Sequence, residues 1–329
     1  MVSPSRPGIL IVSPPGPLGA WIYDVVGSLA KHSGVGVRHI DRNEKLAAVP
    51  DAVHLCQYPS LSAIQAIEAG LLLPVAIICD PLDTAARLVA AKMSLLEAIR
   101  ALTGSMVGHL AIGRTSRSRL IFAQLDVAGS VIERRIAQAL QLPSERQPAA
   151  HGETLHEILD RKTAGAHKVA FDDEQARIIE QTTGALLAFA EGSTDKPLIW
   201  PIDVLFSGDR PNQVAPRVAH VTGPSRIMLY GPYLHLPPSR YDVEIIIAFS
   251  GLIEDIPFLF EVHAGDTCLA QYRIAGRPTG GYRGRLQFEV SDPVAPVEIR
   301  LRNEQGSIEG EVALVELRLS PVQSEISRS

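Results

Sequence analysis

Three basic side chains, those of Arg161, Lys162 and Lys168, fall within the stretch DRKTAGAHK (160–168). The small residues between them, Gly165 included, favour a loop. Such a loop can close over a phosphate, because guanidinium and ammonium groups form charge-assisted hydrogen bonds with its oxygens. We therefore expect Arg161, Lys162 and Gly165 to contribute to an anion site, with a solvated basic loop as the alternative.

A second candidate anion site lies in ILIVSPPGPLGAWIYDVVGSLA (9–30), which predicts a buried strand, a tight turn and a helix. At such a turn, backbone N–H groups and the helix dipole can hold an anion. Prolines occupy three positions of the turn and donate no N–H. The remaining candidate residues are Gly16, Leu18, Gly19 and Ala20. The alternative is a plain strand–helix turn.

Two side chains in AVHLCQYPS (52–60) could act in catalysis. Strand alternation places His54 and Cys56 on the same face. A histidine titrates near neutral pH and can serve as a general base, and a cysteine thiolate is a nucleophile. His54 is the stronger candidate, and a hydrogen-bonded structural histidine is the alternative.

Aromatic residues in the second half of the chain could stack on the flat faces of sugar rings. The candidates are Tyr233, Tyr282 and Trp200, and Tyr230 and Tyr272 are also available. The alternative is that these tyrosines fix the corners of strands.

The composition limits the possible partners and the cellular setting. The chain has 329 residues, enough for two domains, and 31 basic against 36 acidic side chains, which argues against a nucleic-acid partner. Three scattered cysteines without a C-x-x-C pair predict neither a disulfide framework nor a metal site, and indicate a cytoplasmic protein. The N-terminus lacks the apolar region of a signal peptide. The apolar run 71–78 is too short for a membrane span.

Strands and helices alternate over the first half of the sequence. The expected strands are 9–12, 34–40, 52–58, 73–79, 109–113 and 119–125, and the expected helices are 21–31, 60–68, 83–102, 131–140 and 174–191. Asp80, directly before Pro81, is expected to cap a helix, as is Asp172 or Asp173. This alternation predicts a three-layer α/β domain with a parallel sheet.

The second half contains short strands separated by turns, such as RYDVEIIIAF (240–249) and APVEIRLRN (295–303). It predicts an all-β antiparallel sandwich or jelly roll. The expected boundaries are 1–192 for the α/β domain, 193–199 for a linker, 200–321 for the sandwich and 322–329 for a disordered tail.

Four segments of the α/β half, in this order along the chain, resemble motifs of the sulfotransferase family. The segment 13–21, SPPGPLGAW, is similar to the family's SPPRSGSTW loop. The segment 74–88, PVAIICDPLDTAARL, is similar to the family's VVLLRDPRDVAVSL turn. Two later segments, 120–143 and 159–186, are similar to the family's later motifs. The resemblance implies a P-loop fold and the sulfonate donor 3′-phosphoadenosine 5′-phosphosulfate. The donor would be bound by Gly16, Leu18, Gly19, Ala20, Arg161, Lys162 and Gly165, with His54 or Cys56 at the position of the base.

Several positions depart from the family's motifs. Gly16 stands at the place of the loop's basic residue, Pro17 at that of its serine, and Cys79 at that of the arginine expected to bind the 3′-phosphate. Ala123 replaces the glutamate of a Tyr-Glu-Asp motif. These changes indicate a degenerate donor site.

The second half resembles a β-sandwich carried by bacterial glycan-handling proteins, through a GPYxxLPPGxY opening that Tyr233, Pro237, Pro238 and Tyr241 match. Together the resemblances imply a sulfotransferase-like protein of bacterial surface-glycan metabolism, with a carbohydrate partner and a binding or assembly role. An active sulfotransferase, and a structural protein that forms homo-oligomers through a sheet face, are the alternatives.

Overall fold

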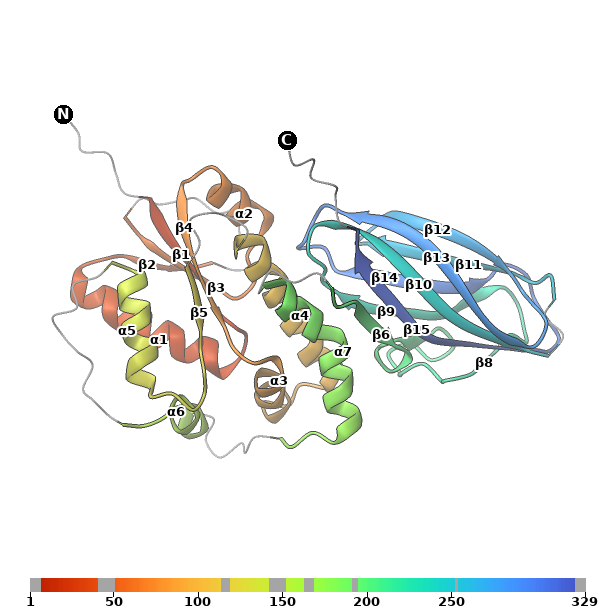
Figure 1. Ribbon diagram of the computed structural model, residues 1–329, viewed down its shortest axis with the longest axis horizontal. Helices are drawn as coiled ribbons and strands as arrows, with labels where there is room; N and C mark the ends of the chain where they lie inside the picture. Colours follow the sequence, from red (N-terminus) through yellow and green to blue (C-terminus); the bar gives the residue numbers. More distant parts are fainter. Residues whose placement is uncertain are drawn as a thin grey trace. The chain divides into compact units, whose positions relative to one another are not determined.

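The computed structural model describes residues 7–40, 51–113, 119–141, 152–162, 169–190, 195–251 and 254–322. The chain divides into two compact units between Ala176 and Arg177. The first contains a parallel sheet with helices, and the second contains two antiparallel sheets (Figure 1). This confirms the fold class expected from the sequence.

The first unit is built on a five-stranded sheet in the order β2-β3-β1-β4-β5, in which every pairing is parallel. Its strands are β1 (Gly8–Val12), β2 (Val37–His39), β3 (Val53–Cys56), β4 (Leu72–Ile78) and β5 (Arg119–Phe122). Its helices are α1 (Pro17–Ser33), α2 (Leu61–Glu68), α3 (Pro81–Ala90), α4 (Leu95–Gly113), α5 (Gly129–Ala139) and α6 (Leu155–Lys162), and α7 (Asp173–Ala190) crosses the division.

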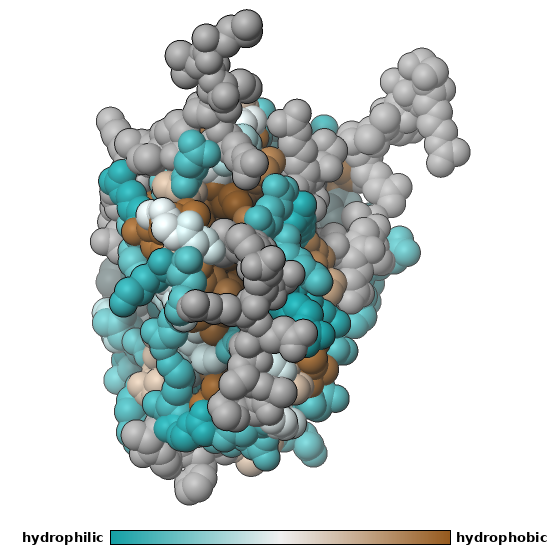
Figure 2. Space-filling view, turned by 90° about the vertical axis from the view of Figure 1, so that its left-hand side faces the viewer, coloured by the Kyte–Doolittle hydropathy of each residue, from teal (hydrophilic) through white to brown (hydrophobic). Residues whose placement is uncertain are grey.

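Each face of this sheet has its own apolar core, because successive strand residues point to opposite sides. Ile11 packs with residues of α1, α5 and α6, whereas its neighbours Leu10 and Val12 pack with residues of α2 and α4. Two helical layers therefore enclose the sheet, as expected. The side of this unit shown in Figure 2 mixes hydrophilic residues (teal) with hydrophobic ones (brown).

Local signals set the helix starts. The Asp80 carboxylate accepts a 3.1 Å hydrogen bond from the backbone N–H of Asp83, and Pro81 follows it at the first helical position. Asp172 accepts a 2.8 Å bond from the N–H of Gln175. Both predicted N-caps are confirmed.

Three local predictions were wrong. Residues 109–113, expected as a strand, form the end of α4, and the helix expected at 83–102 is split into α3 and α4. A short apolar run fits a buried helix as well as a strand, so its pattern does not decide between them. Asp160, Arg161 and Lys162, expected in a loop, form the last turn of α6.

By length and composition, one helix in the described part of the chain could span a membrane. It is the window Leu95–Ile112 of α4, with a mean hydropathy of 1.2. Of this window 61% is buried inside the protein, as it is in a core helix.

The second unit contains one sheet in the order β13-β10-β15-β6, with β8 also paired to β15, and another in the order β12-β11-β14-β9-β7. Its strands are β6 (Leu198–Pro201), β7 (Phe206–Ser207), β8 (Ala219–His220), β9 (Arg226–Leu234), β10 (Ser239–Ser250), β11 (Pro257–Ala264), β12 (Thr267–Ala275), β13 (Gly280–Val290), β14 (Val297–Asn303) and β15 (Glu311–Pro321). The pairings between these named strands are all antiparallel.

Alternation sorts the strand residues of this unit into a core face and an outer face. In β10 every second residue from Tyr241 to Phe249 is buried. In β14 the side chains of Val297, Ile299 and Leu301 are at most 2% exposed. The residues between them are therefore available for an outer surface.

The observed division lies inside α7, ahead of the boundary expected at residue 192. Strand β6 begins at Leu198, within the segment expected as a linker, and pairs with β15. Residues 323–329 of the expected tail lie outside the described residues.

Candidate functional site

The outer side of the β12-β11-β14-β9-β7 sheet carries a group of polar and aromatic side chains. Because Val297, Ile299 and Leu301 point inward, Glu298 and Arg300 point outward. The register places His263 of β11 opposite Glu298, and Glu261 opposite Arg300. We call the set formed by Tyr230, Tyr233, Glu261, His263, Glu298 and Arg300 the polar face.

A bulge in β9 brings Tyr233 onto this face. Val297 pairs with Leu234 and Glu298 with Pro232, so Tyr233 is an extra residue in the register of β9 with β14. It has a φ of 63°, which a tyrosine rarely adopts. In a regular strand Tyr230 and Tyr233 would point to opposite sides, but with the bulge their ring centroids lie 6.3 Å apart. The bulge thus directs the Tyr233 ring towards Tyr230.

Hydrogen bonds hold the Tyr233 side chain in place. Its hydroxyl donates to Oε1 of Glu298 at 2.9 Å, and Nη2 of Arg300 donates to Oε2 of the same carboxylate at 2.7 Å. Glu298 is only 5% exposed, whereas the Arg300 side chain is 32% exposed. A buried carboxylate is stable only when paired in this way, so the three groups act as one unit.

The surroundings also define the protonation of these groups. Burial, and then the hydrogen bond to Glu298, raise the pKa of Tyr233 to about 12. The pKa of Arg300 is raised, chiefly by its hydrogen bond to Glu298. Near neutral pH the phenol therefore stays a neutral hydrogen-bond donor and the guanidinium stays charged.

Tyr230 links this network to further aromatic surface. Its ring lies 5.3 Å from that of Phe206, tilted by 32°, and meets the Tyr233 ring at 73°. The backbone N–H of Asn212 donates a 3.1 Å bond to its hydroxyl. The arrangement places aromatic surface beside the paired Glu298 and Arg300, so groups that can stack and groups that can form hydrogen bonds lie next to one another.

The structure does not bring the other two aromatic candidates to this face. Trp200 is 1% exposed in the core, so its ring cannot stack on a sugar and this expectation was wrong. Tyr282 lies on β13, in the other sheet. Its hydroxyl donates to the carbonyl of Pro278 at 2.8 Å and its ring lies 5.8 Å from that of Phe249. This is the corner-fixing role that the sequence left open.

The strand–turn–helix near the N-terminus has the expected order of elements, β1, a turn and α1. Gly16 is the N-cap of α1 with a φ of 82°, and no side chain among the described residues caps this helix. The N–H of Ala20 donates to the carbonyl of Gly16, and Leu18 is 2% exposed. Gly19 packs tightly: a Cβ there would lie 2.2 Å from the Pro14 oxygen.

Beside this turn lies a small recess that is lined by Pro15, Pro17, Leu18 and Arg87 among others. The side chain of Arg87 is 5% exposed and is paired: Nη1 donates to Asp160 at 2.8 Å. Its Nη2 lies 2.9 Å from Nδ1 of His156. Its charge is therefore already balanced within the protein.

The cations expected from the basic stretch pair with carboxylates elsewhere. Arg161 binds Glu153, and Lys162 binds Asp24 of α1. Asp24 is seven residues beyond Pro17, about 10 Å along the helix from its start. Gly165 lies outside the described residues.

Both catalytic candidates on β3 are inaccessible. His54 and Cys56 are each 0% exposed. Burial raises the pKa of Cys56 to about 12, so its thiol is neutral and unreactive near pH 7. A base or nucleophile must reach the reacting atom, so the expected catalytic role of these two residues was wrong.

These residues do not fit the donor that the sulfotransferase resemblance implies. A nucleotide with two phosphate groups needs several cations or hydrogen-bond donors that converge on it. Among the described residues, Arg87, Arg161 and Lys162 are engaged by carboxylates. We therefore derive no step through 3′-phosphoadenosine 5′-phosphosulfate, whose binding stays an expectation of the sequence.

The sequence did not reveal Glu298 and Arg300 as site residues. The stretch VEIRLRN shows that both alternate with core residues, a signal that they face outward. Alternation alone cannot show that Tyr233, 65 positions away, bonds to Glu298, because the register and the bulge of β9 determine this contact.

No protein-family model matches the chain, and no curated protein matches it in sequence. The similar solved structures include the carbohydrate-binding module CBM36 in complex with calcium and xylotriose (10% identity, TM-score 0.24), of which 78% is covered by 31% of this chain. A carbohydrate-binding module from Cellvibrio mixtus lichenase 5A in complex with cellotriose (14% identity, TM-score 0.25) is covered completely by 38% of this chain.

A third similar structure is an insecticidal delta-endotoxin from Bacillus thuringiensis (16% identity, TM-score 0.23), of which 21% is covered by 42% of this chain. At these TM-scores none of the likenesses supports an argument about a ligand.

Proposed function

We propose that the β-sandwich unit binds a carbohydrate at the polar face. The observation that carries this proposal is the contact between the Tyr230 and Tyr233 rings beside the paired Glu298 and Arg300. One or both rings would stack on the apolar face of a sugar, while the guanidinium of Arg300, held in place by Glu298, would bind its hydroxyl groups.

The Tyr233 ring is held in place before a ligand binds. Tyr233 is fixed by its bulge and by Glu298, so little side-chain freedom is lost when a ligand binds. Both tyrosines are partly exposed, which leaves ring surface for a ligand. Arg300 uses one of its donors for Glu298, and the guanidinium has others to offer.

The test is binding of the 329-residue chain to a panel of oligosaccharides by calorimetry, with xylotriose, cellotriose and β-1,4-galactotriose among the probes. We expect Tyr233→Ala to weaken binding of the sugar that is bound by at least about tenfold, in line with the loss of 1.4 kcal/mol or more. Tyr233→Phe, which keeps the ring, should weaken it less.

Tyr272→Ala is the matched control, because this ring is 41% exposed and lies on β12 outside the polar face. It should leave binding unchanged. An equal loss of sugar affinity in Tyr233→Ala and Tyr272→Ala would contradict the proposal. So would the absence of binding to any sugar in a broad panel.

For the α/β unit we propose a role without sulfonate transfer, supported by the burial of His54 and Cys56. Titration of adenosine 3′,5′-bisphosphate, the product nucleotide of sulfotransferases, tests this. We expect no heat of binding at millimolar nucleotide. Micromolar binding that is lost in Arg161→Ala would restore the enzyme as the better hypothesis.

A further inference from the structure

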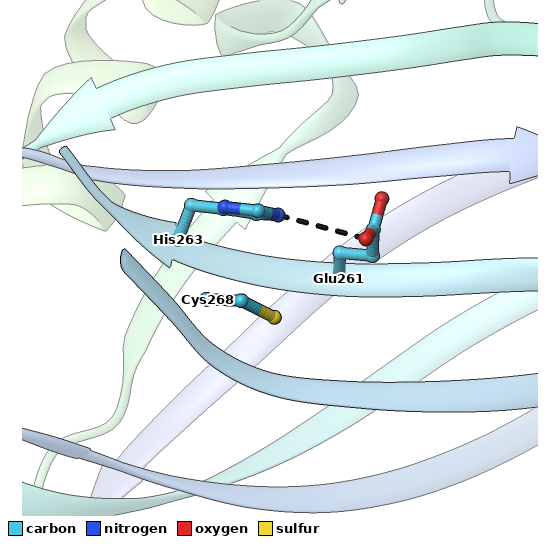
Figure 3. A group of neighbouring side chains, drawn as sticks. All are labelled: Glu261, His263 and Cys268. Carbon is cyan, nitrogen blue, oxygen red and sulfur yellow. Dashed lines mark ion pairs between the residues drawn. The ribbon is translucent and has the colours of Figure 1, made fainter. Parts of the chain in front are cut away.

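We propose that Glu261, His263 and Cys268 form a binding site for a divalent transition-metal ion, and that zinc suits it best. Glu261 and His263 lie on β11 and Cys268 lies on β12, and the three side chains point to the same side of the hairpin (Figure 3). One ligand atom from each residue lies within 4.8 Å of the others. This inference does not depend on carbohydrate binding.

The hairpin explains how residues on two strands come together. Ala264 pairs with Thr267, so Gly265 and Asp266 form a two-residue turn, and Gly265 has the positive φ of 55° that such turns use. This turn places His263 directly opposite Cys268. Glu261 precedes His263 by two residues and therefore shares its face.

The separations are close to those that a tetrahedral ion needs. Bonds of 2.0–2.3 Å from zinc to oxygen, nitrogen and sulfur leave ligand atoms roughly 3.3–3.8 Å apart. Nε2 of His263 lies 3.7 Å from Oε1 of Glu261. Closing the set around an ion thus requires shifts of about 1 Å or less, which side-chain rotations supply.

The histidine nitrogen gives an independent reason to place a ligand here. Nε2 of His263 is buried and has no hydrogen-bond partner among the described residues, since the oxygen of Glu261 is too distant. A buried polar atom without a partner costs free energy. A bound cation would satisfy this atom and the facing carboxylate together.

The types of ligand favour zinc over calcium. Calcium takes six to eight oxygen ligands, and this set offers one carboxylate, one imidazole and one thiol. Zinc binds all three types. The carboxylate and the thiolate would balance its two charges, and the proton of Cys268 would pass to solvent as the sulfur–metal bond forms.

The site has features of an open zinc centre. Three protein ligands leave a fourth position for water or another ligand. Cys268 is exposed, while the side chains of Glu261 and His263 are 16% and 12% exposed, so an ion could enter from the side of the cysteine. Arg300 lies opposite Glu261 on the neighbouring strand, and its positive charge would repel a bound cation. This charge is, however, paired with the carboxylate of Glu298.

The test uses the 329-residue chain, stripped of metal with a chelator and titrated with cobalt(II). We expect a charge-transfer band from the bond between the Cys268 thiolate and cobalt, and the visible bands of four-coordinate cobalt. One equivalent of zinc should remove both. Cys268→Ser should abolish the charge-transfer band, and His263→Gln and Glu261→Gln should weaken cobalt binding at least about tenfold.

His220→Gln is the matched control. His220 and Glu311 form another histidine–glutamate pair in the same unit, with a separation of 3.5 Å. This variant should bind cobalt like the original protein. Absence of the charge-transfer band with excess cobalt, or an equal band in Cys268→Ser, would overturn the proposal. Cobalt binding without that band would overturn it too, because Cys268 would not be a ligand.

Discussion

The Tyr233 hydroxyl donates a 2.9 Å hydrogen bond to the Glu298 carboxylate, which is 5% exposed. Tyr233 is also the extra residue of the β9 bulge, with a φ of 63°. A side-chain contact between β9 and β14 thus helps to hold an unfavourable backbone conformation. The same contact fixes the ring that we propose to stack on a sugar.

Tyr233→Phe should lower the free energy of unfolding of the sandwich by about 1–2 kcal/mol, because the buried carboxylate loses one of its donors. Denaturant unfolding measures this change. A double-mutant cycle with Glu298→Ala isolates the contact, because alanine leaves no acceptor for the Tyr233 hydroxyl, and we expect a coupling energy of about 1 kcal/mol. Additive effects of the two substitutions would show that this hydrogen bond does not stabilise the fold.

Gly19→Ala should destabilise the α/β unit by about 1–3 kcal/mol through overpacking. The added Cβ would lie 2.2 Å from the Pro14 carbonyl oxygen and 2.9 Å from Nε2 of Gln57. Thermal unfolding is the measurement. A loss of stability would show that Gly19 is needed for packing, whether or not the turn also binds an anion.

Gly27→Ala is the control on the same helix, since nothing lies within 4 Å of the position that its added Cβ would take. It should stabilise α1 by up to about 1 kcal/mol, the difference in helix propensity between the two residues. If both substitutions stabilise the protein, the tight packing at Gly19 is refuted.

Periodicity was enough to predict the layers of the fold. In β10 and β14 the apolar residues recur at every second position, and a one-residue shift would expose all of them. The pattern failed at 109–113, where Leu110 and Ile112 are core residues of a helix. Apolar residues two apart on a short segment fit either structure.

The candidate sites depended on contacts that are distant in sequence. Arg161 and Lys162 were expected at a phosphate, but each pairs with a carboxylate that sequence spacing did not indicate. The Glu261–His263–Cys268 cluster did leave a signal, since HAGDTC places a two-residue turn between histidine and cysteine. A search for C-x-x-C pairs alone does not detect it.

The three cysteines should differ sharply in reactivity. Burial raises the pKa of Cys56 to about 12 and that of Cys79 to about 11, while Cys268 is exposed. Since the thiolate is the reactive form, a disulfide reagent at about pH 8 should modify one thiol of the folded metal-free chain and three after denaturation. Cys268→Ser should leave no fast-reacting thiol. Fast modification in that variant would show that Cys56 or Cys79 is accessible.

His109 should make the α/β unit less stable in acid. This residue of α4 is 3% exposed, and burial lowers its pKa below the ordinary value of about 6.5. The unfolded chain therefore binds a proton at this residue at a higher pH than the folded chain does. Stability should fall as the pH drops through about 6.5, and the fall should end below the folded pKa.

Urea unfolding of the original chain and of His109→Gln, each measured between about pH 7.5 and pH 5, tests the role of this residue. The two ring nitrogens of His109 lie near the backbone oxygens of Ser105 and Val12, at 2.6 and 3.1 Å. A neutral ring can donate only one proton, whereas the glutamine amide donates without titrating. The pH dependence should therefore be weaker in His109→Gln. An equal dependence in both proteins would assign the acid sensitivity to other groups.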